Sequence, residues 1–240
     1  MRWNGFGSTI TLREHLSESC KVAIVAALER EVWPLVKDWR TAQKQHEGRA
    51  FKFFEHENVV LVCGGIGAEA ARRAAEAIIE SYQPELIISA GFAGGLDPAL
   101  KTGHALTPRL VIDAGDGSRT DSGTGAGVLV SFAAVADSEQ KASLAKAYGA
   151  DLVDMEAAVV SRCAQAHGIR FTACKVVSDS RDQTLPPVAR FVASDGGFQS
   201  FRFLAHVAVR PWLWAGLGQL VRNSSIAAQS LCKQLAASTQ

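Results

Sequence analysis

The sequence of 240 residues lacks several features that would define its class at once. No apolar run is long enough to span a membrane, and neither charge is in excess, since 25 Lys and Arg face 24 Asp and Glu. Five cysteines stand far apart, without the close pairs of zinc or redox motifs. These absences argue against a membrane protein, a nucleic-acid binder and a metal centre. We therefore expect no metal, no cofactor and a small molecule as the partner.

The amino terminus and the cysteines bear on the compartment. Residues 1–20 have no uninterrupted apolar core, because Arg13, Glu14 and Glu18 interrupt the segment. We expect an N-terminal extension there rather than a secretory signal. Cys63 and Cys174 lie in strand-like runs, which favours buried, unreactive thiols in a reducing compartment. The prediction is a cytoplasmic enzyme or binding protein.

Short apolar runs alternate with helical patterns along the chain. Four runs rich in β-branched residues are typical of strands buried on both faces: residues 22–28, 58–64, 85–91 and 171–178. Helical periodicity covers 68–82 and 155–168, and the second segment ends at Gly168, where a helix should stop. This alternation predicts an α/β fold with a largely parallel sheet.

Two segments do not fit a regular parallel sheet. The alternation across Glu57 and Asn58 predicts a hairpin, and residues 104–114 followed by 127–132 predict a second antiparallel pair. Residues 115–127, rich in Gly and Ser, are typical of an exposed loop. We therefore expect a mixed, curled sheet. We expect one domain over 21–240, with a helical C-terminal extension from about residue 200.

Acidic residues follow the predicted strands, at the edge where α/β sheets bind ligands. Glu31 follows the first strand, Ser178 and Asp179 end the last, and Glu156 opens a helix. Glu31 and Asp179, each taken alone, also fit the start of a helix. Glu156 stands out because it shares a helix face with apolar residues, where an unpaired charge is costly. The sequence predicts a crevice with three carboxylates.

Two glycine segments allow more than one interpretation. Residues 65–70 satisfy the G-x-G-x-x-A form of a dinucleotide fingerprint, but tight packing of a strand on a helix, with an anion or water at the helix start, fits better. Gly94 and Gly95 either let a ligand approach the backbone or form a plain turn.

Five segments in this order resemble one family: "VAIVAALEREV", "GGIGAEAA", "SAGFAGGL", "VDMEAA" and "KVVSDSRD". Over about residues 21–185 they are similar to the purine nucleoside phosphorylase superfamily, particularly its methylthioadenosine/S-adenosylhomocysteine nucleosidases. The resemblance implies a three-layer α/β/α fold. It also implies cleavage, without a metal, of the bond between an adenine-type purine and its ribose.

The resemblance further implies a role for each acidic residue. Asp179 would protonate N7 of the purine, with Ser178 beside it, and Glu156 would accept hydrogen bonds from the ribose hydroxyls, with Met155 against the sugar. Glu31 would position or deprotonate the attacking water. Fixed negative charge near the ribose suits a transition state in which the sugar becomes oxocarbenium-like.

Four more residues belong to the binding site that the resemblance implies: Phe92, Ala93, Gly94 and Phe132. Phe132 is either the surface on which the base stacks or a core residue. Phe92 stands where relatives often carry a small or polar residue, so its bulk bears on the nucleophile or on the 5′ group that fits. Two other departures are Lys175, in place of an arginine, and His104, in place of an aspartate.

The nucleophile and the C-terminal segment leave alternatives open. Phosphorylases gather arginines around phosphate, whereas the candidates here are Arg30, Arg72 and Arg73, so hydrolysis is favoured over phosphorolysis. The C-terminal segment, with Trp212 beside Arg210, predicts a helical hairpin packed on the core or at a dimer interface. It also resembles the tails of hopanoid-associated nucleoside phosphorylases, and such a tail is compatible with peripheral contact to a membrane.

A non-catalytic nucleoside-binding protein is the alternative from another class. The presence of all three acidic residues argues against it. We expect a homo-oligomer, with a dimer favoured, that binds a purine nucleoside and, if phosphorolytic, phosphate.

Overall fold

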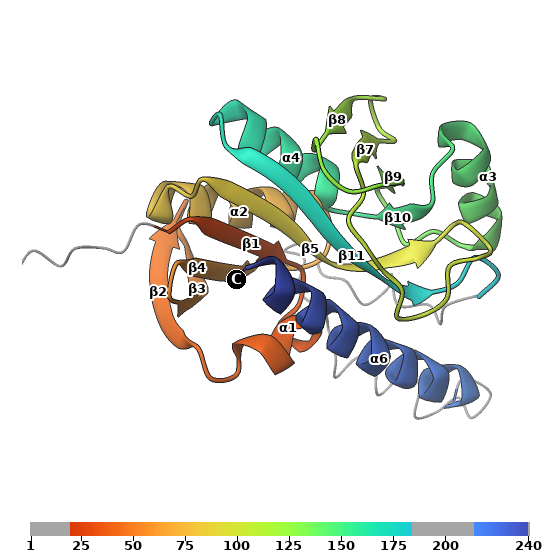
Figure 1. Cartoon of the computed structure of the whole chain (residues 1–240), viewed down its shortest axis with the longest axis horizontal. Coiled ribbons are helices and arrows are strands. Elements are labelled where there is room, and N and C mark those ends of the chain that lie inside the picture. Colours follow the sequence, from red (N-terminus) through yellow and green to blue (C-terminus); the bar gives the residue numbers. More distant parts are fainter. Residues whose placement is uncertain (1–19, 184–213, 240) are drawn as a thin grey trace, which may run out of the picture.

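The computed structural model describes residues 20–183 and 214–239 (Figure 1). The described strands are β1 (Val22–Ala26), β2 (Arg40–His46), β3 (Arg49–His56), β4 (Val59–Cys63), β5 (Leu86–Gly95), β6 (Ala105–Leu106), β7 (Leu110–Asp113), β8 (Arg119–Asp121), β9 (Val128–Ser131), β10 (Leu152–Asp154) and β11 (Arg170–Asp179). The described helices are α1 (Glu29–Val36), α2 (Ala68–Tyr82), α3 (Ser138–Tyr148), α4 (Ala157–Ala166) and α6 (Trp214–Ser238).

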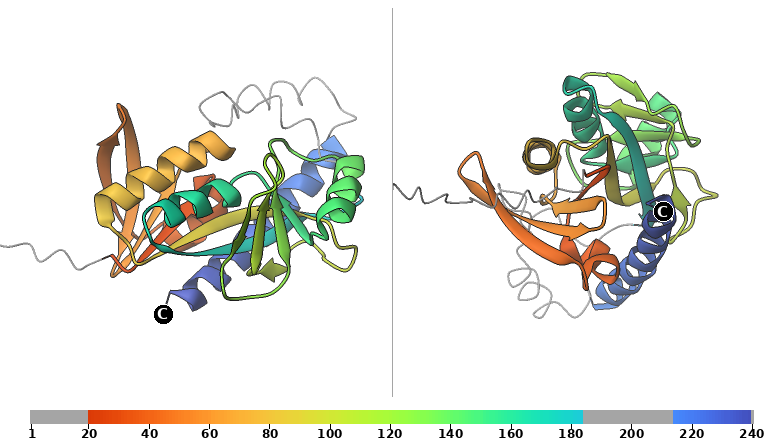
Figure 2. Two further views of the ribbon diagram at one scale, coloured as in Figure 1. Left: turned by 90° about the horizontal axis from the view of Figure 1, so that it is seen from above. Right: turned by 60° about the vertical axis from the view of Figure 1, so that its left-hand side comes forward.

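The strands form one mixed sheet between two layers of helices. The strand order is β2-β3-β4-β1-β5-β10-β9-β7-β8. In addition, β11 pairs with both β5 and β6. Helices α2 and α4 pack on one face, whereas α1 and α6 pack on the other (Figure 2). The predicted three-layer α/β/α architecture with a mixed, curled sheet is confirmed.

Most predicted elements are confirmed, because strands buried on both faces produce the apolar runs by which they were identified. The four predicted strands are β1, β4, β5 and β11, and the two predicted helices are α2 and α4. The hairpin joins β3 to β4 in antiparallel register, and Glu57 adopts a positive φ of 49° in its turn.

One predicted pairing is wrong. The strand within 104–114 pairs with the strand within 127–132 in parallel, with β7 Leu110 opposite β9 Val128. The antiparallel partner of β7 is β8, which lies inside the segment predicted to be a loop. Residues 115–127 contain two turns, one on each side of β8. The chain therefore reverses direction twice, and β9 runs parallel to β7.

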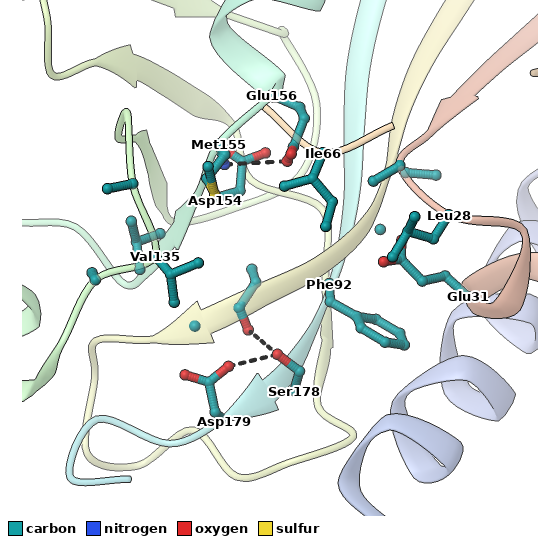
Figure 3. A pocket seen from close by; sticks show the side chains of 18 of the residues that line it. Leu28, Glu31, Ile66, Phe92, Val135, Asp154, Met155, Glu156, Ser178 and Asp179 are labelled. Atoms are coloured by element: carbon teal, nitrogen blue, oxygen red, sulfur yellow. Dashed lines mark hydrogen bonds between the residues drawn. The ribbon is translucent and has the colours of Figure 1, made fainter. Parts of the chain in front are cut away.

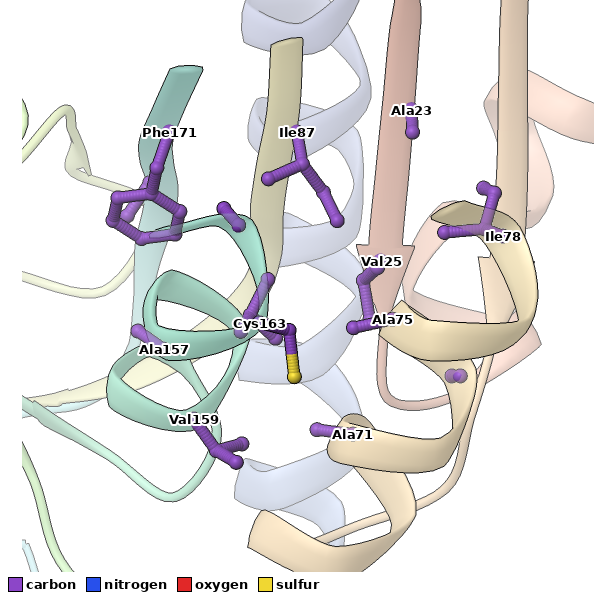
Figure 4. Close-up of a cluster of buried hydrophobic side chains, with 14 of the residues drawn as sticks. Ala23, Val25, Ala71, Ala75, Ile78, Ile87, Ala157, Val159, Cys163 and Phe171 are labelled. Carbon is purple, nitrogen blue, oxygen red and sulfur yellow. The ribbon is translucent and has the colours of Figure 1, made fainter. Parts of the chain in front are cut away.

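Alternate side chains of the central strands supply two separate cores. Ala23 and Val25 of β1 belong to the cluster under α2 and α4, which Figure 4 shows. Ile24 and Ala26 point to the opposite face and join the cluster with α1 and α6. This alternation is the reason why β1 reads as a continuous apolar run rather than as an alternating pattern.

Helix α6 packs along the face away from α2 and α4, against α1 and β11. Its residues Ala227, Leu231 and Leu235 are completely buried. None of the helices in the described ranges has both the length and the apolar character needed to cross a membrane. Residues 1–19 and 184–213 lie outside the described residues. The second range includes Arg210 and Trp212 of the predicted C-terminal extension.

Candidate active site

A cavity of about 170 Å³ opens at the carboxyl ends of β1, β5 and β11. Its lining includes all three predicted carboxylates, Glu31, Glu156 and Asp179 (Figure 3). Five other predicted residues also line it: Phe92, Ala93, Gly94, Met155 and Ser178. Residues more than 140 positions apart in sequence are thus brought together because the parallel strands end at one edge of the sheet.

Glu31 lies in the first turn of α1 and is only 5% exposed. Its Oε2 atom is buried and has no hydrogen-bond partner in the described part of the chain. Burial raises the pKa of Glu31 to about 8, and the nearby charge of Glu156 adds to this effect. A Cβ at Gly91 would lie 3.1 Å from Oε2, so glycine leaves room for this carboxylate. Glu31 is therefore placed and tuned to exchange a proton near neutral pH.

The Glu156 carboxylate binds the start of α2 rather than the helix that it precedes. The Gly67 N–H donates to Oε1 at 2.7 Å, and the Met155 N–H donates to Oε2 at 3.2 Å. Gly67 is the N-cap of α2 and has a φ of 95°, which explains the glycine at this position. The anion expected at the start of this helix is thus Glu156 itself. Burial raises its pKa, as does Asp154, whereas Lys175 opposes them.

Gly64 supports the packing interpretation of the same glycine segment. A Cβ there would lie 2.7 Å from both the Ala70 carbonyl oxygen and the Ala74 Cβ. Glycine therefore lets α2 lie directly against the end of β4.

A buried ion pair between Lys175 and Asp154 lies near Glu156. Lys175 Nζ lies 2.8 Å from Asp154 Oδ2 and donates to Ser89 Oγ at 3.1 Å. Asp154 also accepts the Ala157 N–H at 2.9 Å, so it caps α4. Burial alone would lower the pKa of Lys175, but Asp154 and Glu156 raise it above its ordinary value. The lysine that departs from the family pattern thus keeps a positive charge beneath the cavity.

Asp179 ends β11 and pairs with a lysine that sequence reasoning missed. A register shift between Val177 and Asp179 marks a β-bulge, which re-aims the last side chains of the strand. The Asp179 carboxylate bonds the ammonium of Lys141 from α3, and Ser178 Oγ donates to its other oxygen at 2.6 Å. No sequence motif singles out Lys141. Only the folded position of α3 reveals its partner.

Phe132 is the predicted site residue that the structure does not bring to the cavity. It packs against the hydrophobic cluster that includes Leu96 and Val130, on the core side of β9. Val135, three residues later, lines the cavity instead. Other lining residues that the sequence did not single out for the site include Leu28, Ile66, Ala134, Ala136, Lys141 and Asp154.

Two of the three candidate arginines lie away from the cavity. Arg72 and Arg73 pair with Glu69 on the surface of α2. Arg30 lines the cavity, and His104, the other departure, is exposed. The cationic side chains in the lining are therefore Arg30 and Lys141.

One group of possible metal ligands lies outside the cavity. His46, Glu47 and Glu76 each place a ligand atom within 4.8 Å of the others. Arg72 pairs with Glu76 and lies 3.7 Å from Glu47, so a cation of the chain already serves these carboxylates.

The sequence is similar to those of known proteins. A family model described as the phosphorylase superfamily matches residues 21–139 and 125–195. A 5'-methylthioadenosine/S-adenosylhomocysteine nucleosidase of Marinomonas sp. (strain MWYL1) is 30% identical over 95 residues, which is 38% of this chain and 41% of the relative. The corresponding protein of Staphylococcus haemolyticus (strain JCSC1435) is 35% identical over 95 residues, with the same coverage. The match thus spans about two fifths of these relatives' length.

Solved structures resemble the whole fold. A 5'-methylthioadenosine/S-adenosylhomocysteine nucleosidase from Neisseria meningitidis, in complex with methylthio-immucillin-A, aligns with a TM-score of 0.66 at 19% identity, covering 90% of this chain and 97% of that one. Futalosine hydrolase of Helicobacter pylori strain 26695 aligns with a TM-score of 0.66 at 16% identity, covering 91% and 96%. At these identities the likeness establishes the fold.

Proposed function

Since the chain belongs to the phosphorylase superfamily, we propose that its cavity binds a purine nucleoside and hydrolyses the bond between base and ribose. The observation that carries the proposal is the convergence of Glu31, Glu156 and Asp179 on one cavity at the sheet edge. Nucleosidases among the similar sequences support the same chemistry. The proposed enzyme needs no metal, because a protonated purine is already a competent leaving group.

Each carboxylate has a distinct part in the proposed reaction. Asp179 passes a proton to N7 of the base. The base then takes the electron pair of the breaking bond and leaves as a neutral purine. Glu156 accepts hydrogen bonds from the ribose hydroxyls, and Met155 packs against the sugar. As positive charge develops on the ribose, these fixed negative charges stabilise the transition state more than the substrate.

Glu31 takes the proton of the attacking water in this proposal. Its buried Oε2 has no partner in the described residues, and its pKa near 8 makes it a stronger base than an ordinary carboxylate. Phe92 lines the cavity and shares a cluster with residues of α1, so it bears on the space left for the water and for the 5′ group of the nucleoside.

Water is favoured over phosphate as the nucleophile. A phosphate dianion would enter a cavity lined by four acidic residues, the three predicted ones and Asp154. One of its two cationic side chains, Lys141, is already paired with Asp179. Phosphorolysis, including the hopanoid-associated type, is the outcome that would replace this assignment.

Product analysis with a panel of nucleosides tests the proposal. The protein is incubated with methylthioadenosine, S-adenosylhomocysteine, adenosine and inosine, with and without phosphate. We expect release of adenine and a free sugar, at a rate that phosphate does not change. Asp179→Asn serves as the matched inactive variant. Sugar 1-phosphates would show phosphorolysis, and failure to release any base would refute the enzyme.

The proposal extends to the whole chain and its surroundings. We propose that residues 21–240 form one domain, that the protein is a homodimer and that it acts in the cytoplasm. The burial of α6 against α1 and β11 supports one domain, and five unpaired thiols fit a reducing compartment. Trp33 and Val221, exposed apolar residues on these two helices, are candidates for a subunit contact. Sedimentation analysis tests the dimer, and a monomer at working concentration would contradict it.

A further inference from the structure

A buried ammonium group faces the proposed general acid. The Lys141 side chain is 1% exposed, bonds the Asp179 carboxylate and donates to the Ser180 carbonyl oxygen at 2.9 Å. Both Lys141 and Asp179 line the cavity. A Cβ at Gly94 would lie 3.1 Å from Lys141 Cε, so glycine there makes room for the lysine beside the cavity. The ion pair is therefore built into the site.

The hydrogen bonds of Asp179 raise a problem for its proposed role. One oxygen bonds the Lys141 ammonium, and the other accepts the Ser178 hydroxyl at 2.6 Å. With a donor on each of its two oxygens, the Asp179 side chain is arranged to accept hydrogen bonds on both sides. Of the two donors, the ammonium group of Lys141 gives up a proton far more readily than the hydroxyl group of Ser178 does.

Fixing α3 in place does not account for this pair. Buried ion pairs are weak contributors to stability, because both charges lose their hydration. Helix α3 already has a complete capping box between Asp137 and Gln140, and Leu144 anchors it in a hydrophobic cluster. An apolar side chain at 141 would hold the helix at least as well.

We propose that Lys141 supplies the proton that Asp179 passes to N7 of the purine, an inference that rests on the proposed function. As the bond from C1′ to N9 breaks, its electron pair goes to the purine. Asp179 takes a proton from Lys141, which becomes a neutral amine, and passes it on to N7. The water oxygen bonds C1′ and its proton goes to Glu31. Exchange with solvent then returns Lys141 and Glu31 to their starting states.

Lys141 is thus a positioning and proton-supplying residue that acts through Asp179. Four proteins test this role: wild type, Lys141→Met, Asp179→Asn and the double variant. Base release is measured with the nucleoside that the wild type cleaves fastest. We expect each single change to lower kcat about 100-fold with KM nearly unchanged. The double variant should be no slower than the slower single variant, since both changes remove one proton transfer.

Lys141→Arg separates proton supply from a structural role. Arginine keeps the charge and the ion pair, but it holds its proton far more tightly than lysine. Proton supply predicts that Lys141→Arg folds normally and loses kcat about as severely as Lys141→Met. A structural ion pair predicts that arginine restores activity. This variant also keeps the test decisive if Lys141→Met does not fold.

Lys146→Met is the matched control, because Lys146 is exposed on the same helix. Its kcat should equal that of the wild type, and thermal unfolding should show that all variants are folded. The inference is overturned if Lys141→Arg keeps wild-type kcat, or if the two single losses multiply in the double variant. A wild type that releases no base from any nucleoside refutes the proposed function instead, and this inference with it.

Discussion

Single acidic residues in this protein acquire their properties from what surrounds them. Glu31, Glu156 and Asp179 are ordinary carboxylates in sequence, but the fold places them differently. Among residues 20–183 and 214–239, Glu31 has a buried oxygen without a partner, Glu156 binds a helix N-terminus and Asp179 pairs with a lysine. These different environments fit the three roles proposed for these residues, as base, ribose anchor and acid. The pH dependence of activity should therefore reflect the pKa of single acidic residues.

Activity should rise with pH through the pKa of Glu31. This pKa is raised from 4.5 to about 8, so Glu31 is largely protonated at pH 6 and cannot accept a proton from water. We expect kcat/KM to increase between pH 6 and pH 9 in the wild type. Glu31→Gln should be about 100-fold slower and should lack this rise. Initial rates across this range provide the measurement, and an unchanged rise in Glu31→Gln would contradict the assignment.

At the scale of secondary-structure elements, close approach of α2 to β4 positions the amide that binds Glu156. We expect Gly64→Ala to destabilise the fold by about 1–3 kcal/mol, because a Cβ would lie 2.7 Å from the backbone of Ala70 and the helix must shift. The same shift should weaken nucleoside binding. Denaturant unfolding and KM are the measurements.

Gly218→Ala is the control for that substitution. Gly218 lies in α6, and an added Cβ would meet no described residue within 4 Å. This variant should therefore be as stable as the wild type or about 0.5–1 kcal/mol more stable. Equal losses in the two variants would show that the approach of α2 is not the cause.

The last helix should contribute to the stability of the core. Leu231 is 0% exposed in the cluster that joins α6 to α1 and β11, so Leu231→Ala should cost about 2–5 kcal/mol. Val221 on the same helix is 60% exposed, and Val221→Ala should change the free energy of unfolding by less than about 0.5 kcal/mol. If both variants unfold like the wild type in denaturant, α6 is not part of the cooperative unit.

At the scale of the whole molecule, burial decides what the sequence could predict. Strands such as β1 contact helices on both faces and therefore stand out as apolar runs. β2 carries the polar sequence RTAQKQH at the sheet edge, and α3 has few buried residues, so neither shows a clear pattern. The parallel pairing of β7 with β9 depends on two turns whose direction the glycine-rich segment does not reveal.

The same distinction applies to the site. Carboxylates at strand ends were predictable, since parallel strands bring their carboxyl ends to one edge. Lys141 and Phe132 were not, because their places depend on how α3 and the chain after β9 settle on the sheet. The sequence indicates which strand ends meet. The positions of side chains such as Lys141, which a helix outside the sheet contributes, can be identified only in the folded molecule.

Hydrolysis of a purine nucleoside in this cavity is the proposed reaction. The most direct measurement incubates the protein with methylthioadenosine in phosphate buffer and identifies the sugar product by mass spectrometry, beside Asp179→Asn. We expect adenine and free methylthioribose from the wild type and almost none from Asp179→Asn. A sugar 1-phosphate, or base release that survives in Asp179→Asn, would contradict it.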